Sequence, residues 1–325
     1  MTAVVVVMLA VAWGALALWF DGSTSRVLAG ALAVEFAVIC ILPVVLVRPV
    51  HRGLIVALVP IIAVAFWWTS IAPSNTRDWT PDVARLAQTT FDGSQVTIEN
   101  VRNFADRSDS DYEDRWETRS YHLDKVRGVD MFLSYWGPTL IAHPIASWEF
   151  DDGRHLAISI ETRKETGEWY SALRGFFRQY ELAYVVADER DLIGLRTNYR
   201  GEQVYLYRLR VPSAQARALL VDYLREANRL AKDPRWYNAL TSNCTTMIRY
   251  HAQNIAVDRP FDWRILVNGR VDELAYERGQ IDTSQPFDVL RIHSNITGRA
   301  KAVGNSPDFS SLIRENLPGN HDALK

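Results

Sequence analysis

Cysteine is scarce in this chain of 325 residues, which has only Cys40 and Cys244. So few cysteines cannot form the paired-cysteine spacing of a structural zinc site. The 17 glycines form no phosphate-binding loop, and no segment repeats along the chain. Zinc-binding modules, phosphate-loop enzymes and repeat proteins are thereby excluded, and we predict neither a metal site nor a cofactor.

An excess of charge of one sign is also lacking. The 36 basic and 38 acidic residues leave a formal net charge of -2, and no long basic stripe occurs. Domains that bind nucleic acid usually concentrate Lys and Arg on one face. Nucleic acid is therefore not a predicted partner.

Charged residues are rare in the first 72 positions, where three long apolar runs occur, at 2–20, 27–47 and 53–72. Each run is long enough to cross the ~30 Å hydrocarbon core of a bilayer. A cleaved signal peptide would have a basic start and one shorter apolar core. We therefore expect three retained transmembrane helices in residues 1–72, followed by a short polar linker at 73–78.

The short loops between these runs predict their orientation. The loop at 48–52 carries two arginines, whereas the loop at 21–26 balances Asp21 against Arg26. Basic loops stay in the cytoplasm. We therefore expect a cytoplasmic N-terminus and a third span that leads to the opposite side of the membrane.

Glu35 lies near the middle of the second span, where an ionised carboxylate is costly. A contact with a lipid head group or a proton would be functional. We favour a neutral Glu35 that hydrogen-bonds between helices, because no basic residue occurs at a similar depth. Cys40 in the same span is interpreted as a small buried apolar residue.

The remainder of the chain predicts an α+β domain, with strands first and helices after about position 210. Strand-like composition occurs at 96–104, 130–136, 180–187 and 203–209. Apolar residues at helical spacing follow Ser213, which is a suitable N-cap. A further helix is expected to run to Arg278 and stop at Gly279. After Phe287 apolar residues are few, so we expect a loosely held polar extension at 291–325.

Cys244 lies on the oxidising side of the membrane in this topology, where a lone structural cysteine is unusual. Ser242 or Asn243 can cap a helix at 245–255, which places Cys244 in the first turn. Backbone N–H groups at a helix N-terminus favour the thiolate form of a cysteine. We therefore favour a reactive thiol over the alternative, a small core residue at the head of a buried helix.

A reactive thiolate needs a base, and the chain has seven histidines. His51 is cytoplasmic in the predicted topology, and His321 lies in the tail. His251 is two helical turns from Cys244, roughly 10 Å along the axis. Four candidates remain: His122, His143, His155 and His293.

A predicted hairpin favours His143 among these four. If Asp151-Asp152-Gly153 is a three-residue loop, residue 148 pairs with 156, and the apolar residues share one face. The other face then carries His143 opposite Glu161, with Ser159 alongside. A carboxylate beside an imidazole can orient it as a base. An ordinary surface cross-strand pair is equally compatible with the hairpin alone.

Several short motifs follow one another along the second part of the chain. They are Ser134-Tyr135-Trp136-Gly137, Ile141-Ala142-His143-Pro144, Ile158-Ser159-Ile160-Glu161-Thr162-Arg163, Asp188-Glu189-Arg190-Asp191-Leu192, Leu195-Arg196-Thr197-Asn198, Pro234-Arg235-Trp236-Tyr237-Asn238 and Asn243-Cys244-Thr245-Thr246. These motifs resemble those of the Lnb N-terminal periplasmic domain, which is named for lipoprotein N-acyltransferases. The resemblance covers residues 79–290 in consistent order.

The resemblance implies a circularly permuted papain-like domain, related to NlpC-type enzymes, in which the Cys244 helix packs on an antiparallel sheet. It further implies that Cys244 is the nucleophile and His143 the general base. Glu161 as the orienting residue rests mainly on the hairpin register. Asn243, Trp136, Tyr237 and Ser159 are candidates for substrate binding or for an oxyanion hole.

The function implied is acyl transfer or hydrolysis on a membrane lipid or lipoprotein, through an acyl-thioester. The domain would lie in the periplasm, anchored in the inner membrane. In the acyltransferases the periplasmic domain precedes the membrane helices, whereas here the order is reversed. Two alternatives stay open: a cysteine peptidase or amidase that acts on cell-wall peptides, and a non-catalytic membrane-anchored binding or assembly domain.

The arginines Arg163, Arg178, Arg190 and Arg196 allow two interpretations. They can bind a phosphate or a phospholipid head group, or they can pair with Glu161, Glu181, Glu189 and Asp191 in a structural ion network. We favour the structural network.

Overall fold

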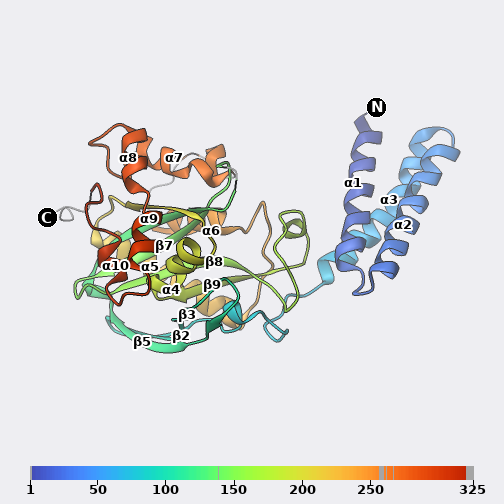
Figure 1. The fold of residues 1–325 in the computed structure, drawn as a ribbon. Coiled ribbons are helices and arrows are strands. Elements are labelled where there is room, and N and C mark those ends of the chain that lie inside the picture. Colours follow the sequence, from blue (N-terminus) through green and yellow to red (C-terminus); the bar gives the residue numbers. More distant parts are fainter. Residues whose placement is uncertain (1, 138, 256–259, 261, 266, 320–325) are drawn as a thin grey trace. The chain divides into compact units, whose positions relative to one another are not determined.

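The chain forms two compact units in a computed structural model (Figure 1), which describes all residues except 1, 138, 256–259, 261, 266 and 320–325. The first unit comprises residues 1–77, 167–181 and 235–239. The second comprises residues 78–166, 182–234 and 240–325.

Three long apolar helices begin the first unit: α1 (Thr2–Asp21), α2 (Arg26–Leu46) and α3 (Val50–Ser70). With 20, 21 and 21 residues, each is long and apolar enough to span a membrane. The three predicted helices are thereby confirmed.

The three helices pack through small and aromatic side chains. Val11, Phe36, Cys40 and Ala57 are buried between them, so the interpretation of Cys40 as a buried apolar residue is confirmed. Glu35 is exposed on the outside of the bundle. The expectation that Glu35 hydrogen-bonds between helices is therefore wrong, because the side of α2 that packs against α1 and α3 carries Phe36 and Cys40 instead.

Eight strands form the main sheet of the second unit, in the spatial order β1-β2-β9-β8-β7-β6-β10, with β5 paired to β2. The strands are β1 (Gln88–Asp92), β2 (Gln95–Arg102), β5 (Trp116–His122), β6 (Val126–Tyr135), β7 (His143–Phe150), β8 (His155–Arg163), β9 (Glu181–Ala187) and β10 (Gln203–Arg208). The pairs β1–β2, β2–β5, β6–β7, β7–β8 and β6–β10 are antiparallel, and β2 meets β9 in parallel. A separate pair consists of β3 (Ala105–Asp106) and β4 (Tyr112–Glu113).

The β7–β8 hairpin has the predicted register. Trp148 pairs with Leu156 and Ile145 with Ser159, and Gly153 in the loop has a φ of 80°. Glycine adopts this left-handed conformation without steric cost. The register follows from burial, because a slip of one residue would move Trp148 and Leu156 to the opposite face.

Helices cover both faces of the sheet, and neighbouring residues of β7 identify which helix covers which face. The Ser147 hydroxyl donates to Glu189 of α4 (Glu189–Gly194). The Trp148 indole N–H donates to the carbonyl of Ala216 in α5 (Ser213–Lys232). Successive side chains of a strand point to opposite faces, so α4 and α5 lie on opposite sides of the sheet.

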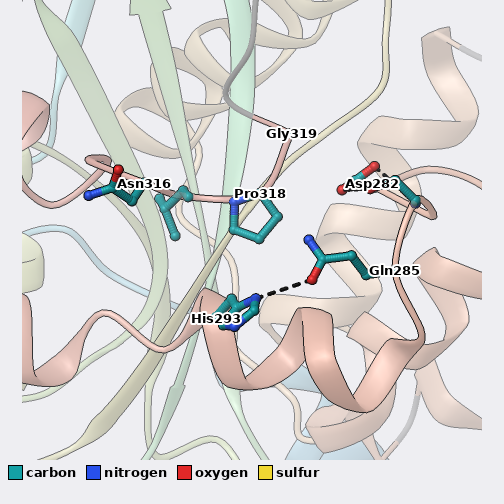
Figure 2. A pocket seen from close by; sticks show the side chains of 8 residues that line it. Asp282, Gln285, His293, Asn316, Pro318 and Gly319 are labelled. Carbon is teal, nitrogen blue, oxygen red and sulfur yellow. Dashed lines mark hydrogen bonds between the residues drawn. The ribbon is translucent and has the colours of Figure 1, made fainter.

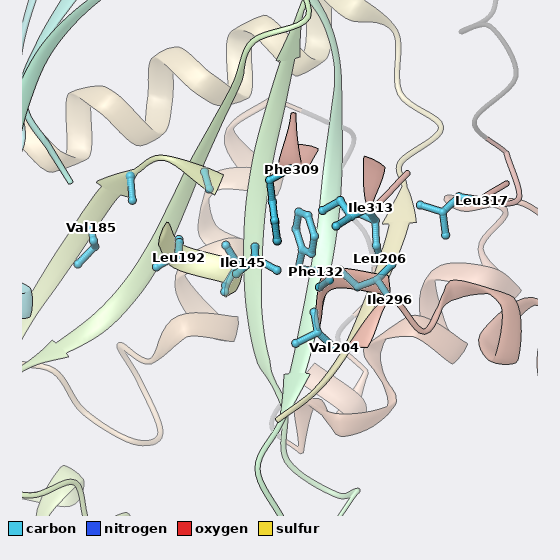
Figure 3. Packing of buried hydrophobic residues seen from close by; sticks show 14 of the residues in the cluster. Phe132, Ile145, Val185, Leu192, Val204, Leu206, Ile296, Phe309, Ile313 and Leu317 are labelled. Atoms are coloured by element: carbon cyan, nitrogen blue, oxygen red, sulfur yellow. The ribbon is translucent and has the colours of Figure 1, made fainter. Parts of the chain in front are cut away.

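The hydrophobic core on the α4 side is completed by the C-terminal part of the chain. Phe132 and Ile145 of the sheet pack with Ile296, Phe309 and Ile313 (Figure 3). These residues belong to or adjoin α9 (Thr297–Val303) and α10 (Phe309–Leu312). The prediction of a loosely held segment is therefore wrong for the described part, because Ile296, Ala300, Phe309, Ile313 and Leu317 recur at helical spacing and are buried.

The remaining helical elements are short, apart from α6. They are η1 (Pro81–Val83), η2 (Leu123–Lys125), η3 (Arg174–Phe176), η4 (Leu195–Tyr199), α6 (Cys244–Ile255), η5 (Trp263–Ile265), η6 (Asn268–Arg270), α7 (Val271–Glu277) and α8 (Phe287–Ser294). The end of α7 before Gly279 confirms the predicted stop. The predicted N-cap Ser213 is instead the first residue of α5, and Pro212 occupies the cap position.

Replacing glycine by alanine should have opposite effects on stability at two positions of the second unit. A Cβ on Gly269 would lie 2.0 Å from the carbonyl oxygen of Thr139, whereas a Cβ on Gly298 in α9 would meet no atom within 4 Å. We expect Gly269→Ala to lower the thermal midpoint of the full-length chain. Gly298→Ala should raise the thermal midpoint slightly, because alanine in a helix adds up to ~1 kcal/mol to the free energy of unfolding. Equal shifts of one sign would contradict this packing.

Candidate active site

The N-terminus of α6 presents Cys244 as the first residue of the helix. The Asn243 side-chain oxygen accepts the backbone N–H groups of Thr245 and Thr246, at 2.9 Å each. In return, the Thr246 hydroxyl accepts the N–H of Asn243. This reciprocal capping explains why the helix begins here. The side-chain oxygen of Asn243, a predicted substrate or oxyanion residue, is engaged in the cap.

His143 is the first residue of β7 and is buried, with a relative exposure of 8%. Its Nε2 lies 2.6 Å from the Ser159 hydroxyl and 3.2 Å from Oε1 of Glu161. The Ser159 hydroxyl donates to the same carboxylate oxygen at 2.6 Å. Ser159, predicted as a substrate or oxyanion residue, lies fully buried between the ring and the carboxylate.

The surroundings of the His143 ring, which include the Cys244 side chain, favour the charged ring. Burial disfavours the imidazolium, but the Glu161 charge and the neighbouring Cys244 side chain outweigh both burial and the charge of Arg196. The pKa of His143 rises from 6.5 to about 9. At neutral pH the ring is therefore an imidazolium in contact with the cysteine.

Glu161 is held as a carboxylate by two cationic side chains. Burial acts to raise its pKa, but His143 and Arg196 hold the pKa well below its usual range. Arg196 donates to Oε1 of Glu161 at 2.7 Å and lies 3.5 Å from Oε2 of Glu202. Glu202 in turn accepts from Ser134, which is paired with His143 in the sheet.

Arg196 is placed in this network by an irregular piece of backbone. It lies in η4, a single π-helical turn that directly follows α4. Such turns shift the direction of side chains within a helix and are frequent at functional sites. The sequence favoured a structural role for Arg196, and its contact with Glu161 agrees with that pairing.

Asn268 links the two chain segments that carry Cys244 and His143. Its Oδ1 accepts the backbone N–H of Ala142 at 2.8 Å. Its Nδ2 donates to the Thr245 hydroxyl at 2.5 Å and lies 3.7 Å from the sulfur of Cys244. Sequence reasoning missed Asn268, because these contacts depend on tertiary packing and leave no periodic signal.

A cavity of about 270 Å³ lies where β6 ends and β10 begins. Its lining includes Tyr135, Trp136, Tyr205, Arg200 and Arg291. The Tyr135 hydroxyl donates to the carbonyl of Gly269, next to Asn268 in the chain. The structure therefore places the candidate Trp136 at the cavity. The candidate Tyr237 is buried and belongs to the other compact unit.

The other histidines considered as bases have different partners. His155 contacts the carbonyl of Gly153 in the hairpin loop. His293 lines a second cavity of about 410 Å³ with Asp282 and Asn316, where its Nδ1 contacts Gln285 at 3.2 Å (Figure 2). His251 is buried between Asp222 and Tyr184. His321 lies outside the described residues.

Fold and site together define a membrane protein with three apolar N-terminal helices and an α+β domain in which a cysteine, a histidine and a carboxylate are in contact. Residues 112–269 match the family model of the Lnb N-terminal periplasmic domain. The comparisons with curated proteins and with solved structures gave no match.

The pKa of His143 provides a direct test of the cluster. Glu161→Gln removes the strongest influence that raises this pKa and leaves burial and Arg196, which both lower it. We expect the pKa of His143 to fall from about 9 to its ordinary value of 6.5 or below, as measured by NMR titration of the labelled ring. Glu113→Gln, an exposed carboxylate, is the matched control. An unchanged titration in Glu161→Gln would contradict the pairing.

The same pairing predicts how stability depends on pH. Because the folded pKa of His143 is raised, the His143–Glu161 interaction stabilises the fold fully below pH 6.5 and is lost as the pH rises through about 9. The difference in thermal midpoint between the wild type and Glu161→Gln should therefore shrink over this range. A constant difference from pH 6 to pH 10 would contradict it.

Proposed function

We propose that this protein is a membrane-anchored cysteine enzyme that transfers or hydrolyses the acyl group of a lipid or lipoprotein. The observation that carries the proposal is the contact between Cys244 and His143 at the head of α6, with Glu161 behind the ring. A nucleophile beside a base that is itself oriented by a third group is the usual arrangement for covalent catalysis. The order His143, Glu161, Cys244 along the chain is the order expected of a circularly permuted papain-like fold.

The first half of the reaction forms an acyl-thioester. The Cys244 sulfur, as a thiolate beside the imidazolium of His143, attacks the carbonyl carbon of a lipid ester. The carbon–oxygen bond to the alcohol then breaks, and His143 gives its proton to the departing oxygen. The products are a free alcohol and an acyl group bound to the Cys244 sulfur.

The second half releases the acyl group. Neutral His143 takes a proton from an incoming amine or water, which attacks the thioester carbonyl. The carbon–sulfur bond breaks, and the thiolate and imidazolium are restored. An amine gives N-acyl transfer and water gives hydrolysis.

Two donors can stabilise the negative oxygen that forms in each half. The backbone N–H of Cys244 is at the first position of α6, where helical N–H groups lack partners within the helix. The Asn268 amide lies 3.7 Å from the sulfur. We assign Asn268 a supporting role at the oxyanion beside the backbone N–H of Cys244.

The membrane anchor fits this substrate class. Tethering a domain at the bilayer raises the effective concentration of lipid-linked substrates. The distribution of arginines in the two short loops supports an inner-membrane location with a cytoplasmic N-terminus.

The direct test is acylation by the 4-nitrophenyl ester of an alkyne-tagged fatty acid. The full-length wild type should acquire a label on Cys244 that hydroxylamine releases, as detected by peptide mass spectrometry. Cys244→Ala should lose the label, and His143→Ala should form it ~10²–10⁴-fold more slowly.

Two variants control for other groups. Cys40→Ala and His293→Ala alter the second cysteine and a histidine of a different cavity, and both should retain the wild-type labelling rate. Equal labelling of the wild type, Cys244→Ala and His143→Ala would refute the thiol-enzyme proposal. Turnover of an N-acyl peptide without turnover of lipid esters would favour the peptidase or amidase alternative.

A further inference from the structure

The segment between β8 and β9 belongs to the same compact unit as the membrane-spanning helices. It comprises Gly167–Glu181 and lies within the matched family domain, yet it packs with the helices. Phe177 stacks against Phe20 of α1, with 5.0 Å between ring centroids. Gln179 donates to Asp21 at 2.6 Å and to the Phe20 carbonyl at 3.0 Å.

The end of α3 holds the same segment. Arg178 donates to the carbonyl of Ile71 and lies 4.5 Å from the ring of Trp68. The Trp68 indole donates to Asp21 at 2.7 Å, so both helix ends share one polar cluster. These contacts place the segment at the level where α1 ends and α3 ends, which is where the hydrocarbon gives way to water.

Exposed apolar side chains are concentrated on this segment. Trp169 is 70% exposed, Leu173 is 50% exposed, and Tyr170 and Phe176 are 45% and 38% exposed. Water-facing loops rarely display four such residues within eight positions, and large exposed apolar patches mark interaction sites. Aromatic residues such as Trp and Tyr favour the membrane interface, because their rings are apolar and their edges are polar.

The backbone of the segment is fixed from the inside, so its apolar residues are displayed outward. Arg174 donates to Glu168 and Gln179 at 2.7 Å each. The Tyr180 hydroxyl donates to the carbonyl of Trp169 at 2.7 Å. Arg174 and Tyr180 thus tie the two ends of the segment together by hydrogen bonds within it.

We propose that Gly167–Glu181 is an interfacial membrane-docking element, in which Trp169, Tyr170, Leu173 and Phe176 insert into the lipid bilayer. The lipid surface is the occupant because the segment continues the surface already formed by the ends of α1 and α3. The element is separate from the thiol chemistry, and its docking does not depend on the proposed activity.

Insertion depth tests this proposal on the full-length chain in lipid nanodiscs of phosphatidylethanolamine and phosphatidylglycerol. In a Cys40→Ala, Cys244→Ser background, single cysteines at Trp169 and Leu173 would carry a nitroxide label. Val56→Cys on the exposed side of α3 serves as the lipid-facing reference, and Ser110→Cys as the water-facing reference.

We expect oxygen to accelerate the relaxation of the nitroxide labels at positions 169 and 173, as at position 56. A water-soluble nickel chelate should have little effect on the labels at these positions. A pattern like that of position 110 at both sites would overturn the proposal. A second measurement avoids the labels: brominated phospholipids should quench the fluorescence of the wild type more than that of Trp169→Phe. Equal quenching of these two proteins would also count against insertion.

Discussion

The candidate site depends on one electrostatic constraint, the confinement of Glu161 between His143 and Arg196. A buried carboxylate is costly unless cations or hydrogen-bond donors compensate it. Here the two cations and the Ser159 hydroxyl all converge on the carboxylate. The consequence is a His143 ring that stays charged at neutral pH beside the only cysteine of its compact unit.

Each element around this constraint has a specific role in maintaining it. The β7–β8 register brings Glu161 and Ser159 to the His143 strand, and the π-helical turn after α4 brings Arg196. The Asn243 cap begins α6 at Cys244, and Asn268 holds the start of that helix to the chain before His143. The fold thus assembles the site from four separate segments.

Local structure could be predicted from the sequence, whereas tertiary contacts could not. The apolar alternation around Asp151-Asp152-Gly153 predicted the hairpin, because only one register buries Trp148 and Leu156 together. The C-terminal helices were missed because apolar residues such as Ile296, Phe309 and Ile313 are few in a mainly polar sequence. They become core residues only when Phe132 and Ile145 of the sheet lie opposite them.

The same limit applies within the site and the membrane unit. The positions of Cys244 and His143 followed from capping and register, but Asn268 and Glu202 join them only through packing. Glu35 was expected between the helices but lies on the outside of the bundle. Hydropathy identifies a membrane span but does not predict which side of the helix faces its neighbours. The place of Gly167–Glu181 beside α1 and α3 depends on the tertiary contacts of Phe177, Arg178 and Gln179, which leave no signal in the sequence.

The central claim is that the imidazolium maintained by Glu161 keeps Cys244 in its reactive form. It is tested most directly by the rate at which iodoacetamide alkylates Cys244 in the full-length chain between pH 5 and pH 10. The account predicts fast alkylation at pH 7 in the wild type and much slower alkylation in both His143→Gln and Glu161→Gln. Equal rates in all three proteins at pH 7 would contradict it.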